Sequence, residues 1–150
     1  YTPGTFTDSQ NPHITTDGHE LALLVVFESA MQHMPDRPSA YAELPEEVRA
    51  ELSVLPTVWD DTKLLAGYPG ESVVIARRSG DVWYVAGLNG RDEDVALSFS
   101  LDRLGLKDGA NVSLYADGTE QHGFTIGSMA ASELASVPCL ARGGFMAVIR

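Results

Sequence analysis

The stretch HELALLVVFES, residues 19–29, begins with a histidine–glutamate pair like the one that opens the zinc-binding helix of many metalloproteases. Such a helix needs a second histidine four residues after the first, so that both imidazoles face one zinc ion. Leu23 occupies that position and cannot bind a metal. The pair therefore does not predict a zinc hydrolase. Glu20 is interpreted instead as a capping acid three residues after the expected N-cap, Asp17, and His19 as a surface residue of the first turn.

The two acids of this stretch, Glu20 and Glu28, do not have the spacing of a glycosidase pair. A glycosidase needs its two carboxyl groups roughly 5–9.5 Å apart. Positions 20 and 28 share a face of a helix, but they lie about 12 Å apart along its axis. We therefore expect Glu28 to accept hydrogen bonds from neighbouring backbone or from an arginine.

Other side chains that could bind or react are more simply explained by structure. His33 and Asp36, in HMPDRP, could contact a ligand together, but a structural histidine beside a turn-forming aspartate is favoured. Cys139 lies among apolar residues and no motif activates it, so we expect a buried, inert thiol. Trp83 and Tyr84 could offer sugars a platform, although neighbours on a strand point to opposite faces, so at least one belongs to the core. The motifs predict no catalytic residue and no metal ligand.

The elements that would position these residues change character near residue 57. Before it, the pattern predicts a helix over 17–29, a short buried strand at 30–34, and a helix or two short helical pieces over 39–55. The first of these helices is apolar on all its faces, so it must be covered on several sides.

From Thr57 onward the hydrophobic period changes to two, which is typical of strands. Ser79-Gly80 separates two such runs and predicts a hairpin. The expected strands are SVVIARR, DVWYVAGLN, DVALSFSL, NVSLYADG, GFTIGSM and GGFMAVIR. Their spacing predicts an antiparallel sandwich or barrel. The chain is thus expected to divide into a helix-rich part, residues 1–56, and an all-β part, residues 57–150.

Composition restricts the classes of partner. A length of 150 residues suits one domain, or one small domain with part of another. The formal net charge of −11 disfavours both nucleic acid and anionic membrane surfaces. The longest apolar run, Leu21 to Phe27, is far shorter than the ~20 residues of a membrane-spanning helix. We therefore expect no nucleic-acid partner and no membrane span. One cysteine excludes an internal disulfide and leaves the compartment open.

Five stretches carry a resemblance to a known family, and together they extend over essentially the whole chain. They are YTPGTF, HELALLVVFES, MQHMPDRPSAY, PTVWDDTKLLAGYPGESVVIARRSGDVWYVAGLNG and GGFMAVIR. These stretches resemble the carboxyl-terminal part of glycoside hydrolase family 97, the bacterial α-glucosidases and α-galactosidases. The segment from Trp59 to Gly90 is long and specific.

The resemblance implies an architecture in three parts: an N-terminal β-sandwich, a central (β/α)8 barrel and a C-terminal antiparallel β-sandwich domain. On that template residues 1–56 would be the C-terminal remnant of the catalytic barrel. Residues 17–29 would form a barrel helix, residues 30–34 the last barrel strand and residues 39–55 the last barrel helix. The fold class expected for this chain is therefore α+β, with the last strand–helix units of the barrel followed by the β-sandwich domain, residues 57–150.

The resemblance also implies where the chemistry of the family lies. Its catalytic glutamates and its calcium-binding glutamates belong to segments upstream of the part matched here, and none of the ten glutamates of this chain lies in a stretch like them. Calcium is therefore implied only for the intact enzyme, with no cofactor in this chain. Because loops that follow barrel strands face the active site, residues 2–14 and 34–38 would rim the sugar pocket. The substrate-rim candidates are Tyr1, Thr2, His33 and Asp36.

The function expected from these observations is the C-terminal part of a family 97 glycoside hydrolase, supporting the barrel and inactive alone. Its partners would be the N-terminal part of the same enzyme and, in the intact enzyme, an α-linked oligosaccharide. The family implies a periplasmic or secreted location. The alternatives are a non-catalytic carbohydrate-binding or protein-interaction module, and a stand-alone enzyme. Because the first third has more apolar surface than it can cover by itself, we expect the chain to self-associate or to bury residues 21–31 against its β part.

Overall fold

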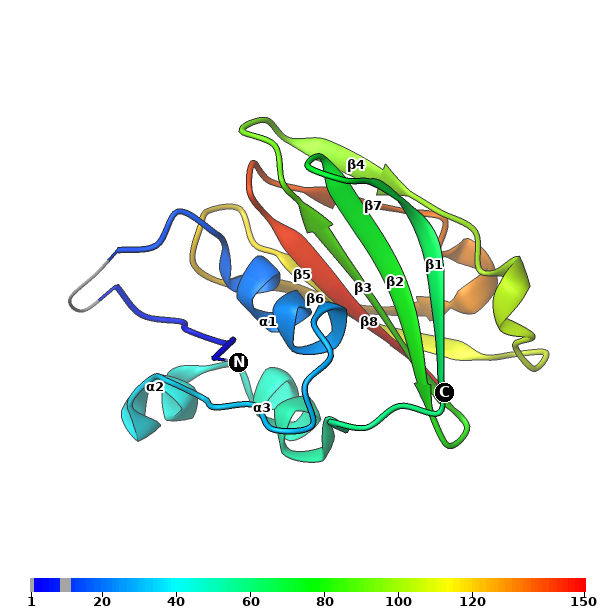
Figure 1. Ribbon diagram of the computed structural model, residues 1–150, viewed down its shortest axis with the longest axis horizontal. Helices are drawn as coiled ribbons and strands as arrows, with labels where there is room; N and C mark the ends of the chain where they lie inside the picture. The colour runs from blue at the N-terminus through cyan, green and yellow to red at the C-terminus, as the bar shows by residue number, and fades with distance from the viewer. Residues whose placement is uncertain (1, 9–11) are drawn as a thin grey trace.

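The structure, a computed structural model, describes residues 2–8 and 12–150, in which three α-helices precede eight strands (Figure 1). The helices are α1 (Asp17–Val26), α2 (Pro38–Glu43) and α3 (Glu46–Val54). The strands are β1 (Asp61–Tyr68), β2 (Ser72–Ser79), β3 (Val82–Asn89), β4 (Val95–Ser98), β5 (Asn111–Asp117), β6 (Phe124–Ala130), β7 (Ser136–Cys139) and β8 (Gly144–Ile149). Two short 3-10 helices, Asp102–Leu104 and Ala131–Glu133, follow β4 and β6.

The strands form two antiparallel sheets. The larger has the order β1-β2-β3-β8-β5-β6, and the smaller pairs β4 with β7. In Figure 1 the helices lie to one side of the six-stranded sheet, and β4 with β7 to the other. The molecule therefore has three layers, and the expected antiparallel, sandwich-like β part is confirmed.

The central strands β3 and β8 are buried along almost their whole length, because both faces of the sheet are covered. Trp83 and Tyr84 show the alternation directly: Trp83 belongs to the hydrophobic cluster between the two sheets, and Tyr84 to the cluster beneath the helices. Both are about 5% exposed or less. Neither side chain is free to form a platform for sugars.

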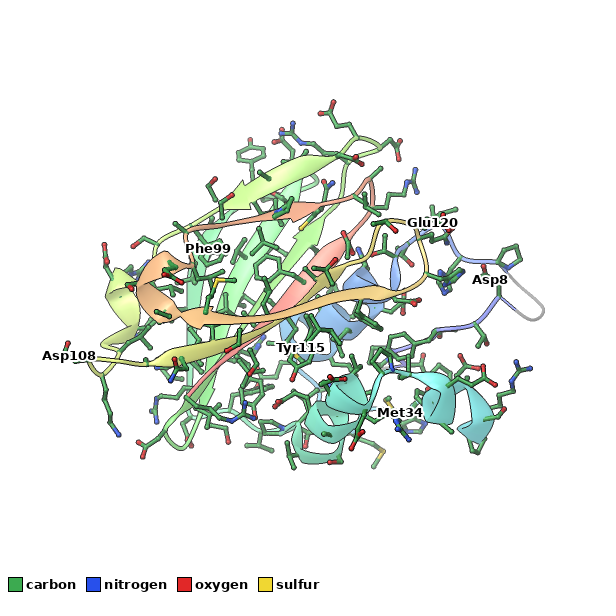
Figure 2. The ribbon with its side chains drawn as sticks, turned by 180° about the vertical axis from the view of Figure 1, so that it is seen from behind. Asp8, Met34, Phe99, Asp108, Tyr115 and Glu120 are labelled. Carbon is green, nitrogen blue, oxygen red and sulfur yellow. The ribbon has the colours of Figure 1, made fainter. Side chains whose placement is uncertain are left out.

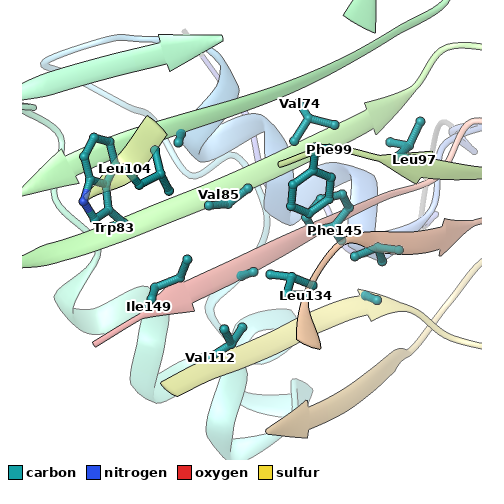
Figure 3. Close-up of a cluster of buried hydrophobic side chains, with 14 of the residues drawn as sticks. Val74, Trp83, Val85, Leu97, Phe99, Leu104, Val112, Leu134, Phe145 and Ile149 are labelled. Carbon is teal, nitrogen blue, oxygen red and sulfur yellow. The ribbon is translucent and has the colours of Figure 1, made fainter. Parts of the chain in front are cut away.

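The cluster between the sheets is built around a pair of stacked rings (Figure 3). Phe99 and Phe145 lie with ring centroids 5.6 Å apart and planes inclined by 14°. Gly87, on the neighbouring strand, leaves the space that the Phe145 ring fills, since a Cβ there would collide with the ring. Leu97 and Val137 extend the same cluster from β4 and β7.

Helix α1 lies on the opposite face of the sheet, against β3, β8 and β5. Its residues Leu21, Leu24 and Val25 are at most 1% exposed, and they share a cluster with Met146 and Val148 of β8. The chain thus covers most of this apolar helix with its own sheet, which is one of the two outcomes expected from the sequence. The expectation fails beyond the helix, where Phe27 and Met31 remain 49% and 69% exposed.

The structure corrects two local expectations and decides between the alternatives of a third. The N-cap of α1 is Thr16, whose hydroxyl accepts a hydrogen bond from the His19 amide, and not Asp17. Residues 30–34 form no strand, because no neighbouring strand lies in position to pair with them. For residues 39–55 the structure shows two short helices, one of the two alternatives expected, and these begin at Pro38 and Glu46.

Candidate functional site

Asp36, one of the rim candidates from the sequence, joins two loops through hydrogen bonds of its carboxylate. We call a buried or half-buried charged residue that joins distant segments in this way a fastener. Its carboxylate accepts hydrogen bonds from the Phe6 amide at 3.0 Å and from the Thr7 hydroxyl at 2.8 Å. The Asp36 amide donates to the Tyr41 hydroxyl, which donates in turn to the Gly4 carbonyl, each at 3.0 Å. Partial burial alone would raise the pKa of Asp36, but the hydrogen bonds from Thr7 and from backbone amides outweigh it and lower that pKa. The carboxylate is thus held in its charged form by the loop that it binds.

The other predicted rim residues do not join this cluster. His33 is exposed, and in the part of the chain that the structure describes it shares no hydrogen bond with Asp36. Thr2 is exposed as well, and Tyr1 lies outside the described residues. The rim assignment of these four residues therefore stays a prediction.

A second fastener, Asp117, ends β5 and was not singled out from the sequence. Its carboxylate, in a residue 6% exposed, accepts hydrogen bonds from the Thr16 hydroxyl and from the amides of Leu140 at 2.8 Å and Gly144 at 3.1 Å. A Cβ at Gly18 would collide with this carboxylate, so α1 can approach β5 only with glycine there. Burial raises the pKa of Asp117, and the hydrogen bond from Thr16 partly opposes that rise.

A third fastener, Arg77 of β2, closes the other end of α1. The guanidinium donates from Nε to the Val25 carbonyl at 2.7 Å and from Nη2 to the Val26 carbonyl at 3.1 Å. It also donates to the Thr62 hydroxyl at 2.9 Å and to Glu28 at 3.3 Å. A cation at the C-terminal carbonyls of a helix satisfies their unpaired acceptors and favours the helix dipole. The arginine partner that the sequence predicts for Glu28 is confirmed.

Another buried acid, Glu51, ties α3 to the sheet. Its two carboxylate oxygens lie 2.8 and 3.0 Å from Nη2 of Arg150, and one of them accepts from the Tyr115 hydroxyl at 3.5 Å. Burial raises the pKa of the Tyr115 phenol, and the nearby Glu51 charge adds to that rise. No local pattern marks this pair, because its members are 99 residues apart in the chain.

His122 bridges two acids at the start of the helical segment. Its Nε2 lies 2.8 Å from Asp8 and its Nδ1 lies 3.1 Å from Asp17. Because each ring nitrogen faces a carboxylate, the doubly protonated ring fits this place best, and the hydrogen bonds to Asp8 and then to Asp17 raise the pKa of His122. Across the described ranges 2–8 and 12–150, no group of three His, Cys, Asp or Glu side chains is placed to hold a metal ion.

A surface hollow of about 560 Å³ lies beside Trp83, and two of its cations, Lys63 and Arg78, lie over the indole ring and are paired with acids. Lys63 and Arg78 stand over the indole ring at 5.8 and 5.9 Å from its centre. Lys63 pairs with Asp61 at 2.9 Å, and Arg78 with Asp60 at 3.7 Å. The ring that a sugar would stack on is therefore covered by cations.

Two further expectations concern reactivity and membranes. Cys139 is buried, and burial raises the pKa of its thiol to about 12, so the reactive thiolate is absent at neutral pH, as expected. In the described part of the chain, none of the helices has the length and apolar character needed to cross a bilayer.

Comparison with known proteins shows which family this chain resembles. Residues 58–150 match the family described as "Glycosyl-hydrolase 97 C-terminal, oligomerisation". A probable retaining alpha-galactosidase of Streptomyces bingchenggensis is 36% identical over 151 residues, which cover 99% of this chain and 23% of that protein. A retaining alpha-galactosidase of Bacteroides thetaiotaomicron is 42% identical over 106 residues, which cover 69% of this chain and 15% of that protein. The chain thus spans less than a quarter of the length of these relatives.

The fold agrees with the family match. A solved structure of a glycoside hydrolase family 97 enzyme from Pseudoalteromonas sp. strain K8 superposes with a TM-score of 0.84 at 24% identity, covering 99% of this chain and 25% of that chain. Since the family match extends over more than half of the residues and includes every strand described above, this chain belongs to the glycosyl-hydrolase 97 C-terminal family.

Proposed function

We propose that this chain acts as the C-terminal part of a retaining α-galactosidase, where it supports the catalytic barrel and provides a surface for assembly. The names of the two curated relatives support the reaction, since both are retaining alpha-galactosidases. The description of the matched family supports the role in assembly. The α-linked oligosaccharide, and the N-terminal part of the enzyme that would act on it, belong to the same proposal.

The attachment of α1 to the sheet carries the proposal. The helix buries one side in the core of the β part, and its two ends are fastened by Asp117 and Arg77. Its far side keeps Leu23 and Val26 only half-buried and leads to the exposed Phe27. A helix held rigidly on one side and apolar on the other can support a second hydrophobic layer.

We propose the catalytic barrel of the enzyme as that second layer. Residues 17–29 and 39–55 would be barrel helices, and residues 30–34 would become a barrel strand once neighbouring barrel strands are present to pair with it. The loops joined by Asp36 would then lie near the rim of the sugar pocket. Calcium enters only as an ion of the whole enzyme, held by residues other than those described here. The periplasmic or secreted location of the family completes the proposal.

Hydrolysis assays test the catalytic part of this proposal. We expect the purified 150-residue protein to release no nitrophenol from nitrophenyl α-galactoside or α-glucoside, because its buried acids are committed to fastening the fold. Turnover that survives repurification and follows the protein peak would overturn the proposal. A retaining alpha-galactosidase from Bacteroides thetaiotaomicron serves as the positive control for the assay.

Affinity electrophoresis separates this role from that of a carbohydrate-binding module. We expect the protein to migrate equally in gels with and without galactomannan or starch, because Trp83 and Tyr84 are buried. Retardation by either polysaccharide would favour the binding module instead.

A further inference from the structure

We propose that the outer edge of β6 is the surface through which two copies of this chain associate, by antiparallel pairing of β6 with β6. The inference deepens the proposed role in assembly and rests on it. It names the strand and the partner, a second copy of the chain.

The two edges of the six-stranded sheet differ in how well they are protected. β1 carries Asp61 and Lys63, and its register with β2 shifts between Leu64 and Ala66, which marks a bulge. Charges and bulges are the devices by which natural sheets prevent edge pairing. β6 has neither: all seven of its residues pair in register with β5, and no charged residue occurs from Gly123 to Ser132.

The open side of β6 is accessible. Thr125, Ile126, Gly127 and Ser128 are all exposed, and Ile126 is 37% exposed. β6 ends the strand order of the sheet, and Figure 2 shows it leading away from the turn at Glu120 along the margin of the sheet.

The hydrogen-bond pattern tells which β6 backbone groups point outward. Asn111 exchanges both backbone hydrogen bonds with Arg150, at 3.0 Å each, so the odd-numbered residues of β5 bond to β8 and the even-numbered ones to β6. In the register of the pair, the even-numbered residues of β5 face Thr125, Gly127 and Met129. The backbone N–H and C=O groups of Phe124, Ile126 and Ser128 therefore point away from the sheet.

These three residues are placed symmetrically for pairing with themselves. Phe124 and Ser128 lie two positions on either side of Ile126, so a two-fold axis at Ile126 aligns Phe124 of one copy with Ser128 of the other. Each aligned pair then exchanges hydrogen bonds in both directions. The next outward amide along β6, that of Ala130, already donates to Glu133 at 3.3 Å. The symmetric set of outward amides therefore ends at Ser128.

Charge also favours this edge for a contact between identical chains. Each copy carries a formal net charge of −11, so most surfaces of two copies repel each other. The edge of β6 offers an uncharged segment at which the copies can meet with the least repulsion. A two-fold contact of this kind is closed, and it gives a dimer rather than a filament.

Sedimentation velocity of substituted chains over micromolar concentrations tests the inference. Ser128→Pro removes an outward N–H without breaking the ladder to β5, and Ile126→Lys places two like charges opposite each other. We expect each change to weaken dimerisation at least tenfold. Ser128→Ala keeps the amide, and Leu64→Lys puts the same charge on the other edge strand, so both controls should dimerise like the unsubstituted chain.

Hydrogen exchange on the unsubstituted chain gives a result that does not depend on how the variants fold. We expect the amides of Phe124, Ile126 and Ser128 to become protected as the concentration rises, while the exposed amides of β1 do not change. Unaltered dimers in both Ser128→Pro and Ile126→Lys would overturn the choice of β6 but leave the role in assembly intact. A chain that stays monomeric throughout would overturn the inference, and a hydrolytically inactive monomer would still agree with support of the barrel.

Discussion

At the scale of single residues, this chain uses its buried charges as fasteners between segments that are distant in sequence. Asp117 joins residues before α1 to β5 and to the start of β8, and Arg77 joins the end of α1 to β2. Removing a charge from water is costly unless hydrogen bonds replace its hydration. Both groups meet that condition, since most of their polar atoms have partners.

Replacing Asp117 by asparagine should destabilise the fold. The amide of asparagine can accept at one oxygen only, and its NH2 group would face the donors of Leu140 or Thr16. We expect the free energy of unfolding to fall by about 1–3 kcal/mol, the usual cost of leaving a buried group unsatisfied. Urea titration followed by circular dichroism measures the change. The control is Asp81→Asn, because the side chain of Asp81 is 90% exposed; an equal loss in both variants would contradict the role given to Asp117.

His122 should give the stability of the chain a dependence on pH. Its pKa in the fold is raised above the ordinary value of 6.5 by Asp8 and Asp17, so its contribution is complete below 6.5 and is lost as the pH rises through the raised value. His19 acts in the opposite direction below 6.5, since burial lowers its pKa.

The thermal midpoint, Tm, of the chain and of His122→Ala measured between about pH 6 and pH 8 tests this dependence. We expect the Tm of the unsubstituted chain to fall with rising pH across this interval and that of the variant to fall less. Parallel curves would show that the histidine bridge contributes nothing.

At the scale of elements, the junction between α1 and the sheet depends on the shape of a single guanidinium. Arg77 reaches two carbonyls of α1 with different nitrogens, and a lysine ammonium is a point charge that cannot reproduce this fork. The neighbouring Arg78 points to the other face of the sheet, over Trp83.

Arg77→Lys should therefore loosen the end of α1. We expect a loss of about 1.5–3 kcal/mol in the free energy of unfolding, as for hydrogen bonds to a charged group, and faster hydrogen exchange in the last turn of the helix. Arg78→Lys is the matched control, since its side chain is 35% exposed and should tolerate the change. If both variants exchange at the same rate, the fastener is not Arg77.

The elements also show which features of the fold can be predicted from the sequence. The hairpin between β2 and β3 was predicted because Gly80, with φ of +58°, marks its turn. The alternation of apolar and polar residues in DVALSFSL predicted a strand, and β4 forms over its first part, with Leu97 buried and Ser98 exposed. Strands of this kind can be predicted because the pattern that forms them lies within their own residues. β1 and β7 escaped prediction because a bulge interrupts the alternation of β1, and Pro138 lies within the short edge strand β7.

The fasteners of the candidate site could not be predicted, because their partners lie far away along the chain. Asp17 has the residue type of an N-cap, yet its carboxylate accepts from the Gly123 amide at 2.7 Å, and Thr16 caps the helix instead. Asp36 was singled out, but its partners Phe6 and Thr7 are about 30 residues earlier. A local pattern indicates that such a residue is polar and near a turn, and only the tertiary fold decides what it binds.

At the scale of the whole molecule, the β part covers most of the apolar helix α1. The sequence indicates that the first third has more apolar surface than it can cover by itself, and burial against the β part is one of the two outcomes expected from it. The structure shows how this burial is achieved, because β3 and β8 are apolar on both faces and α1 covers one of them. Phe27 and Met31 are among the large apolar side chains that remain exposed, and they lie where we propose that the barrel attaches.

The position of β8 has a consequence for how the protein is made. Among the strands, β8 is the last to be synthesised, yet it stands in the middle of the six-stranded sheet, between β3 and β5. On the ribosome the two halves of the sheet therefore lack the strand that pairs with both of them until Gly144–Ile149 has emerged. A polypeptide that stops before Gly144 lacks the central strand of its sheet. We therefore expect proteases to remove such truncated translation products, while chains that contain β8 survive.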